Sequence, residues 1–344
     1  MSIIDKPSDY FNTVLYTGTG ATQSISGLNF QPDFTWIKGR SGATDHALYD
    51  AVRGTTKDMA SNTLDAETTQ ATGLTAFSTD GFTVGALAKL NTSSATYSSW
   101  NWLGANGTAS NGNGSIDSTV SANTTSGFSI VSYSGNSTSG ATVGHGLGVT
   151  PSMIIVKRRT AGEQWEVYHK TLGATKRMAL DTTEASSASS SRWNNTEPTT
   201  SVFSLGNSGA TNTSGSTYIA YCFADVQGYS KFGSYTGNGN ADGTFVYTGF
   251  SPAFVIFKRS SGTGNWQLLD NKRLGYNVEN RTIYPNSTLA EQDENDADLL
   301  SNGFKLRGSG TDGNGSGSTY IYMAFASEPF TTSTTNGSIP VTAR

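Results

Sequence analysis

A lysine followed twelve positions later by an aspartate or a histidine recurs three times along the 344-residue chain. The three pairs are Lys38 with Asp50, Lys157 with His169, and Lys258 with Asp270. An ammonium and a carboxylate on adjacent strands can pair, and a surface pair of this kind contributes about 0–1 kcal/mol. Because histidine replaces aspartate in the second pair, a shared catalytic or metal-binding role is disfavoured. We predict structural pairing or turn formation, with ligand binding as the alternative.

Residues suited to catalysis are few. The histidines are His46, His145 and His169. No Gly-x-Ser-x-Gly or His-Glu-x-x-His motif accompanies them, which disfavours a Ser-His hydrolase and a zinc peptidase. Glycoside hydrolysis needs two carboxylates facing each other across the sugar. The acids considered for an envelope-polysaccharide depolymerase are Glu163, Glu166 and Glu184. No acidic pair recurs among the copies, so we predict that the protein is not an enzyme.

One acidic run has oxygen ligands at the spacing that calcium loops use. Its candidate ligands are Asp293, Asn295, Asp296 and Asp298. The run lacks the central glycine and the full pattern of an EF-hand, and acidic surface turns are common. Calcium is therefore a weak alternative to the prediction that no cofactor is bound. The same stretch, residues 289–300, is the nearest that the chain comes to a helix.

Three aromatic residues lie in polar surroundings and are candidates for binding a glycan or a partner subunit. They are Trp193, Tyr276 and Tyr284. An exposed ring can cover the apolar face of a sugar while nearby amides bind its hydroxyls. Packing onto a partner subunit is the alternative, and it is the favoured interpretation.

The recurring lysines belong to longer blocks that repeat in the same order. Each lysine is preceded six positions earlier by a proline, and an apolar run lies between them. The prolines are Pro32, Pro151 and Pro252. Each copy closes with a strand that begins at a tyrosine: Tyr97, Tyr218 or Tyr320. We therefore predict three copies of one unit, in residues 1–120, 121–227 and 228–330, followed by a polar tail in residues 331–344 that lacks a strand pattern.

Composition and patterning indicate an all-β protein. The chain has 40 Gly and only 14% charged residues, and its apolar residues come in short runs separated by turn-forming residues. In the closing strand, side chains alternate between a face led by Trp100, Ile219 and Ile321 and a face with small residues. We predict that the first face is the core and that another layer covers the second. Each copy is expected to be a β-sandwich module of the jelly-roll or lectin type.

Several classes of partner are disfavoured. The net charge is −4 and no long basic run is present, which argues against nucleic-acid binding. No apolar run is long enough to insert into a membrane, and no secretion signal is evident. The single cysteine, Cys222, excludes an internal disulfide. We expect a protein that is made in a reducing cytoplasm.

The blocks in residues 10–20, 34–40 and 48–54 resemble a repeat family of tailed bacteriophages, found especially in phages of marine bacteria and cyanobacteria. The later copies carry weaker versions of the same blocks, and the second copy departs most, at His169 and Leu172. The family comprises virion and tail-fibre-like proteins, and it offers no catalytic residue to carry over to this chain.

The resemblance implies a virion protein made in the host cytoplasm, a tail-fibre or tail-tip component that contacts the host surface. A capsid decoration or head-fibre protein is the alternative, and a depolymerase is third. The expected partners are other virion proteins and a host surface glycan. A homo-oligomer is also expected, with a trimer favoured, because phage appendages are commonly symmetric.

Overall fold

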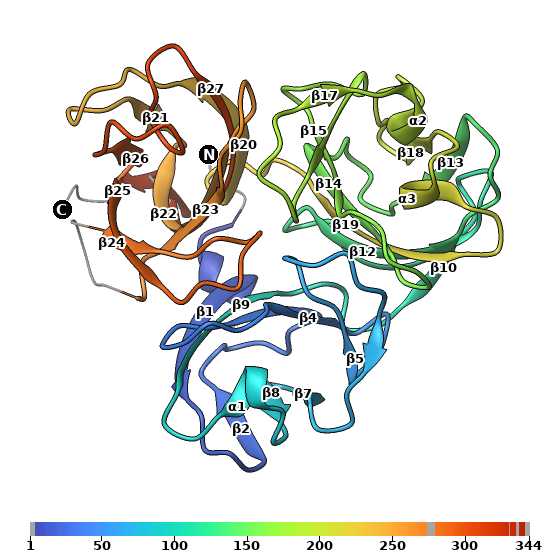
Figure 1. The fold of residues 1–344 in the computed structure, drawn as a ribbon, viewed down its shortest axis with the longest axis horizontal. Coiled ribbons are helices and arrows are strands. Elements are labelled where there is room, and N and C mark those ends of the chain that lie inside the picture. The colour runs from blue at the N-terminus through green and yellow to red at the C-terminus, as the bar shows by residue number, and fades with distance from the viewer. Residues whose placement is uncertain (1–3, 274–278, 330, 335–336, 341–344) are drawn as a thin grey trace.

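The computed structural model describes residues 4–273, 279–329, 331–334 and 337–340. Antiparallel strands dominate this part of the chain, and its helices span three or four residues each. The prediction of an all-β protein is therefore confirmed. Figure 1 shows the three repeats as three lobes around a common centre, with the first in blue, the second in green and the third in orange.

Each repeat places four antiparallel strands of the same order next to the centre. In the first repeat the order is β1 (Phe11–Thr17), β9 (Thr96–Trp102), β3 (Phe34–Gly39) and β4 (Ala47–Asp50). In the second it is β12 (Phe128–Ser134), β19 (Thr217–Phe223), β14 (Met153–Arg158) and β15 (Glu166–His169). In the third it is β20 (Ser230–Thr236), β27 (Thr319–Pro329), β22 (Phe250–Arg259) and β23 (Trp266–Asp270). The closing strand of each repeat thus lies inside its inner sheet.

The second inner sheet is extended at both edges. It gains β11 (Ser118–Asn123) and β10 (Ala109–Asn111) beside β12, and β16 (Lys176–Ala179) and β17 (Ser187–Ala188) beside β15. The predicted boundary at residue 120 therefore falls inside β11, and the second sheet already begins at Ala109. The boundary at residue 227 falls between β19 and β20.

Smaller sheets cover the outer side of each repeat. The first has β2 (Gln23–Ser26), β8 (Gly81–Val84) and β7 (Leu74–Ser78); the second has β13 (Ala141–Gly144) and β18 (Val202–Leu205). The third has β21 (Phe245–Tyr247), β26 (Gly303–Leu306), β25 (Gln292–Leu300) and β24 (Glu279–Thr282). The remaining elements are η1 (Pro7–Asp9), β5 (Lys57–Asp58), β6 (Thr68–Thr69), α1 (Ala88–Asn91), α2 (Ser190–Trp193) and α3 (Gly209–Asn212).

The three repeats share one central hydrophobic core, to which all three inner sheets contribute. Trp102, Phe223 and Phe325 hold equivalent positions in the closing strands and meet there, with ring centroids 5.7–6.2 Å apart. The predicted core face of these strands is confirmed, since its large side chains all lie in the central core. The small-residue face is covered by the outer layer of the same repeat, as in the case of Ala220 and Cys222.

Burial on both faces explains the unbroken apolar runs. In β14, Met153 and Ile155 face the central core, whereas Ile154 and Val156 face the outer core of the second repeat. A strand that lies between two cores needs apolar side chains on both faces, so its sequence does not alternate. Sequence reasoning found these runs, but they do not by themselves reveal that one face belongs to a core shared among repeats.

Two local predictions are wrong. The acidic stretch closest to a helix forms strand β25, which pairs with β24 and β26. The tail was expected to have no strand, but its described main chain forms the hairpin of β28 (Thr331–Thr334) and β29 (Gly337–Pro340).

Candidate functional site

The three recurring lysines bind the main chain of a neighbouring repeat. Lys157 donates from Nζ to the carbonyl of Leu64 in the first repeat at 2.8 Å. Lys258 donates to Thr183 in the second repeat at 3.3 Å, and Lys38 donates to Thr288 in the third at 3.3 Å. These contacts form a closed cycle around the centre. Burial lowers the pKa of each lysine to about 8.

The residues twelve positions after the lysines also join repeats, but in the opposite direction. The Tyr221 hydroxyl donates to Asp50 at 2.8 Å, and the Trp100 Nε1 donates to Asp270 at 2.9 Å. His169 takes a different partner because Met323 stands where the other two repeats have Tyr221 and Trp100. Its Nε2 donates to the Tyr322 carbonyl at 3.1 Å.

The predicted pairing of these lysines with the aspartates or the histidine is wrong. The register places Asp50 opposite Phe34, four residues before Lys38, and Asp270 opposite Phe254. Each aspartate instead forms a buried ion pair with an arginine three residues later, Arg53 or Arg273. The second repeat has Leu172 at that place, packed against the central core, so its junction is free of this buried ion pair.

A third cycle involves large rings. Trp165 donates from Nε1 to the Ala60 carbonyl at 2.8 Å, and Trp266 donates to the Ala179 carbonyl at 2.9 Å. His46 occupies the equivalent place in the first repeat and contacts the Tyr284 carbonyl through Nε2 at 3.0 Å. Since a carbonyl only accepts, His46 carries its proton on Nε2, while Nδ1 accepts from Trp36 at 2.8 Å. The histidine therefore substitutes for a tryptophan in a structural role.

The histidines and acids considered for catalysis are also held in the scaffold. Burial lowers the pKa of His169 to about 4, and it lowers the pKa values of His46 and His145 as well. Glu166 is fully buried, and both its oxygens accept from arginines, Arg177 and Arg192, at 2.8 Å. The other two depolymerase candidates pair with arginines at 3.8 Å, Glu163 with Arg158 and Glu184 with Arg177.

The aromatic candidates are not exposed rings. Trp193 is 2% exposed and packs edge-to-face against Tyr168, with the centroids 6.0 Å apart. Tyr284 is 7% exposed, and its hydroxyl donates to Glu294 at 2.5 Å. Tyr276 lies outside the described residues. The predictions that these rings stack on a sugar or pack onto a partner subunit are therefore wrong for Trp193 and Tyr284, because a polar neighbourhood in the sequence does not decide whether a side chain is buried.

The calcium candidates lie on strand β25 rather than in a loop. Asp293 is 3.6 Å from Arg281, and Asp298 is 2.9 Å from Arg307. Asn295 and Asp296 stand between them, and their side chains lie outside the described part of the structure. Within that part, no group of three or more His, Cys, Asp or Glu side chains is placed to hold a metal ion.

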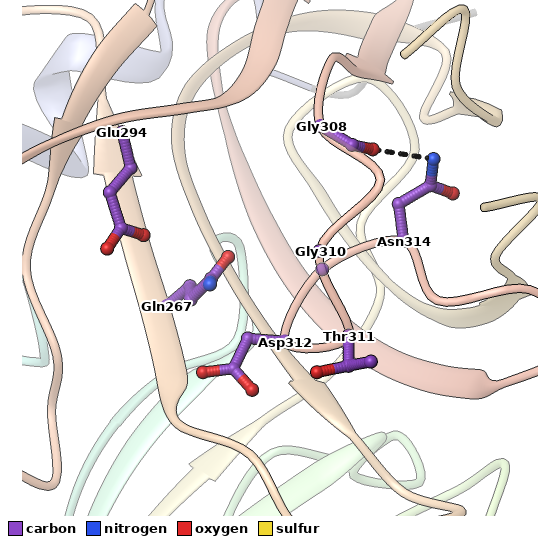
Figure 2. A pocket seen from close by; sticks show the side chains of 8 residues that line it. Gln267, Glu294, Gly308, Gly310, Thr311, Asp312 and Asn314 are labelled. Carbon is purple, nitrogen blue, oxygen red and sulfur yellow. Dashed lines mark hydrogen bonds between the residues drawn. The ribbon is translucent and has the colours of Figure 1, made fainter. Parts of the chain in front are cut away.

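A polar pocket of about 310 Å³ lies between the two layers of the third repeat, and we call it the third-repeat pocket. Figure 2 shows its lining: Gln267 from β23, Glu294 from β25, and the glycine-rich loop of residues 308–314. Asp312 accepts from the main-chain and side-chain nitrogens of Asn265 at 3.2 and 3.1 Å. Asn314 is buried and holds the loop by donating to the Gly308 carbonyl at 2.9 Å.

Gln267 is the unusual member of this pocket. It is only 2% exposed, yet its Oε1 has no hydrogen-bond partner in the described structure. The equivalent residue is Ala47 in the first repeat and Glu166 in the second. In the second repeat, Glu166 accepts from two arginines, and one of them is Arg177. The equivalent of Arg177 in the third repeat is Thr282, because β23 pairs with residue 283 as β15 pairs with residue 178. The amide oxygen is thus an acceptor that the fold leaves open.

The third-repeat pocket borders a turn that all three repeats share. In all three repeats an asparagine six residues before the closing tyrosine ends the same turn: Asn91, Asn212 and Asn314. The residue just before it is Leu90 in the first repeat and Thr211 in the second, and both are fully buried. In the third repeat that residue is Gly313, and a Cβ placed there would stand 3.1 Å from the Phe257 ring and 3.3 Å from Gln267 Oε1, so these side chains occupy the space instead.

Electrostatics in the pocket are mixed. It carries the carboxylates of Glu294 and Asp312, and the Lys258 ammonium lies close enough to interact with Asp312. Burial lowers the Lys258 pKa to about 8, and Asp312 partly opposes that change. The pocket therefore presents mainly hydrogen-bond acceptors, next to a fixed positive charge.

Sequence reasoning missed Gln267, Glu294 and Asp312, which come from three separate elements. A comparison of the three turns that end at Asn91, Asn212 and Asn314 contains the signal, since the buried Leu and Thr become Gly in the third. The change from Glu166 to Gln267 is a second signal of the same kind.

A family model described as a domain of unknown function, DUF7483, matches residues 6–329. The match spans all three repeats as one unit. No curated protein and no solved structure matches the chain. Among the described residues, no helix has the length and apolar character required to cross a membrane.

Proposed function

The chain belongs to the DUF7483 family of domains of unknown function, and we propose that it is a bacteriophage virion protein. In this proposal it is a tail-fibre or tail-tip component that contacts the host surface without catalysing a reaction. It would be made in the host cytoplasm and assembled with other virion proteins. The resemblance of its repeat blocks to virion proteins supports this proposal.

The single observation that carries a surface-binding role is the third-repeat pocket. The recurring lysines, acids and rings are engaged in holding the three repeats together. They support a rigid scaffold rather than chemistry. The third repeat adds to this scaffold a polar pocket that is lined by a residue with an unpaired buried acceptor. A binding role in which the scaffold presents a recognition site accounts for both features.

We further propose that each repeat is a β-sandwich module of the jelly-roll or lectin type. An inner and an outer sheet with a hydrophobic core between them support this assignment. The central core adds a contact that separate modules in a row would lack. The three modules of the proposal therefore form one body.

A homo-oligomer, with a trimer favoured, remains part of the proposal. The small-residue faces of the closing strands are covered within the chain. Contacts between copies must therefore use the outer surfaces. Light scattering on the purified protein gives the mass of the assembly, and a monomer at micromolar concentration would contradict this part.

Immunogold electron microscopy of intact virions tests the location. Label on the tail would support host contact, and the full chain should then bind host cells. Label on the capsid would instead support the alternative of a decoration or head-fibre protein. No label on particles, with the protein present in infected cells, would refute a virion role. Shortening of host polysaccharide by the purified protein would establish the depolymerase.

A further inference from the structure

We propose that the third-repeat pocket binds one ring of a hydroxyl-rich ligand, a sugar residue, through Gln267, Glu294 and Asp312. The inference deepens the proposed function, because it names the ligand class and the residues through which host contact would occur. It can also be tested on the purified chain, independently of where the protein sits on a particle.

Unpaired acceptors define what the ligand must bring. A buried amide oxygen without a partner costs free energy unless a donor reaches it. Gln267 Oε1 is such an atom, and the residue lines the pocket (Figure 2); because the oxygen itself has less than 1 Å² of accessible surface, the side chain must turn toward the ligand to accept from it. Glu294 and Asp312 add carboxylate oxygens, which also only accept when ionised. The complementary ligand therefore presents several donors, as the hydroxyls of a sugar do.

Size limits the ligand to one ring. Sites for small molecules span roughly 300–1,000 Å³, and this pocket, at about 310 Å³, is at the lower limit. A single sugar residue suits this volume, whereas a longer glycan would have to continue along the surface. Weak binding by one residue is consistent with attachment by many copies, since linked sites multiply their effect.

A neutral ligand fits better than a metal cation. The described pocket provides two carboxylates, and each is already engaged: Glu294 by the Tyr284 hydroxyl and Asp312 by Asn265. The Lys258 ammonium interacts with Asp312 and would repel a cation bound there. Hydroxyl groups carry no charge and are not opposed in this way.

Gly310 gives a sharp way to close the pocket. It lines the pocket, and a Cβ placed on it would meet no heavy atom within 4 Å. Its φ lies outside the left-handed region, so a side chain is not strained there. The first repeat has Leu87 at the equivalent turn position. The variant Gly310→Leu should therefore place a bulky side chain at the edge of the pocket, obstruct it, and leave the fold intact.

A matched control is Gly107→Leu. Gly107 is exposed in the first repeat, a Cβ there also meets nothing within 4 Å, and its φ is likewise outside the left-handed region. It adds the same side chain far from the pocket in the sequence. Asp312→Asn is a second pocket variant, which keeps an acceptor for Asn265 but removes the charge.

The experiment is saturation-transfer difference NMR on the full chain with glucose, galactose, mannose, rhamnose, N-acetylglucosamine and N-acetylgalactosamine. At least one sugar should give a signal with the unmodified protein and with Gly107→Leu. Gly310→Leu should lose that signal, and Asp312→Asn should weaken binding about tenfold or more. Thermal unfolding of each variant checks that it is folded.

Three results would overturn the inference. One is the absence of a signal from every sugar, and another is a signal that Gly310→Leu leaves unchanged. The third is calcium binding that Asp312→Asn abolishes in a protein that binds none of the sugars. If no sugar binds but the antibody labels the tail of virions, the sugar site in the pocket is refuted and the virion role stands. If a sugar binds but no particle is labelled, the sugar site stands and the virion role is refuted.

Discussion

We predict that Asp50 is required for the stability of the junction between the first and second repeats. Its side chain and that of Arg53 are both fully buried and form an ion pair, and Tyr221 of the second repeat donates to the same carboxylate at 2.8 Å. The variant Asp50→Ala leaves a buried guanidinium without its main counter-ion. It also removes the acceptor of the Tyr221 hydroxyl.

The magnitude follows from the partners that remain. Breaking a buried ion pair by removing one partner costs about 3–5 kcal/mol. Arg53 keeps Glu67, whose oxygen is 3.3 Å from Nη1, and the carbonyls of Leu48 and Lys57. We therefore expect a loss near the lower limit, about 3 kcal/mol. Tyr221→Phe removes one hydrogen bond and should cost about 1 kcal/mol.

The second junction indicates how the first could be rebuilt. There, His169, Leu172 and Met323 occupy the positions of Asp50, Arg53 and Tyr221 in the cycle. The triple variant Asp50→His, Arg53→Leu, Tyr221→Met should recover most of the stability, to within about 1.5 kcal/mol of the parent. The Ala220 carbonyl, equivalent to that of Tyr322, is the expected acceptor for the new histidine.

Equilibrium unfolding in urea, followed by tryptophan fluorescence, measures these free energies. Asp50→Ala and Tyr221→Phe, alone and together, form a double-mutant cycle, and a coupling energy of about 0.5–3 kcal/mol is expected for residues in contact. A loss of less than about 1 kcal/mol for Asp50→Ala would refute the argument that the Arg53 guanidinium lacks a sufficient counter-ion once Asp50 is removed. A triple variant as unstable as Asp50→Ala would refute the equivalence of the junctions.

Three further predictions concern pH and the shared core. Stability should fall as the pH drops from about 6.5 to about 4, because His169 takes up a proton at its ordinary pKa in the unfolded chain but only near pH 4 in the folded chain. This histidine alone accounts for about 3 kcal/mol. Urea midpoints at pH 7 and 4.5 measure the change, and His169→Gln should reduce the difference between them. Stability should rise between pH 8 and 9.5, because Lys38, Lys157 and Lys258 lose their protons near pH 8 in the folded chain and near pH 10.5 in the unfolded chain. A urea midpoint that does not change over that range would contradict the burial of these ammonium groups. Residues 109–227 expressed alone should lack a cooperative thermal transition, since the inner faces of β12, β14 and β19 lose the other two repeats; a sharp transition by circular dichroism would show that the shared core is dispensable.

Much of the fold could be predicted from the sequence because it depends on local patterns. The closing strands, with Trp100 and Ile219 on one face and Cys222 on the other, follow directly from the alternation of side chains. The contacts of Lys157 and Asp50 could not be predicted in this way. Their partners lie in other repeats, at positions that spacing within one repeat does not specify.

The site was missed for a related reason. Trp193 and Tyr284 stand among polar residues in the sequence, but the fold buries both rings. The third-repeat pocket instead depends on the absence of a side chain at Gly310 and on a glutamine from a distant strand. Such a site becomes visible in the sequence only when equivalent positions of the repeats are compared.

Departures from the threefold pattern are of two kinds, and the difference bears on function. At the second junction, His169, Leu172 and Met323 change together, and the histidine finds a carbonyl for its donor. That change is compensated inside the fold. In the third repeat, Gln267 replaces a residue that is either apolar or fully paired, and the fold supplies no partner for its Oε1.

An uncompensated buried acceptor costs about 1–3 kcal/mol, and an alanine at position 267, as in the first repeat at Ala47, would avoid that cost. Gly310 adds to it, because a Cβ placed there would meet no heavy atom within 4 Å, whereas Leu87 stands at the equivalent place in the first repeat. Two separate changes, at positions 267 and 310, thus reduce stability at one place, and both residues line the polar pocket. Selection for stability alone would favour reversing each of them, whereas selection for a ligand that donates hydrogen bonds favours retaining them together.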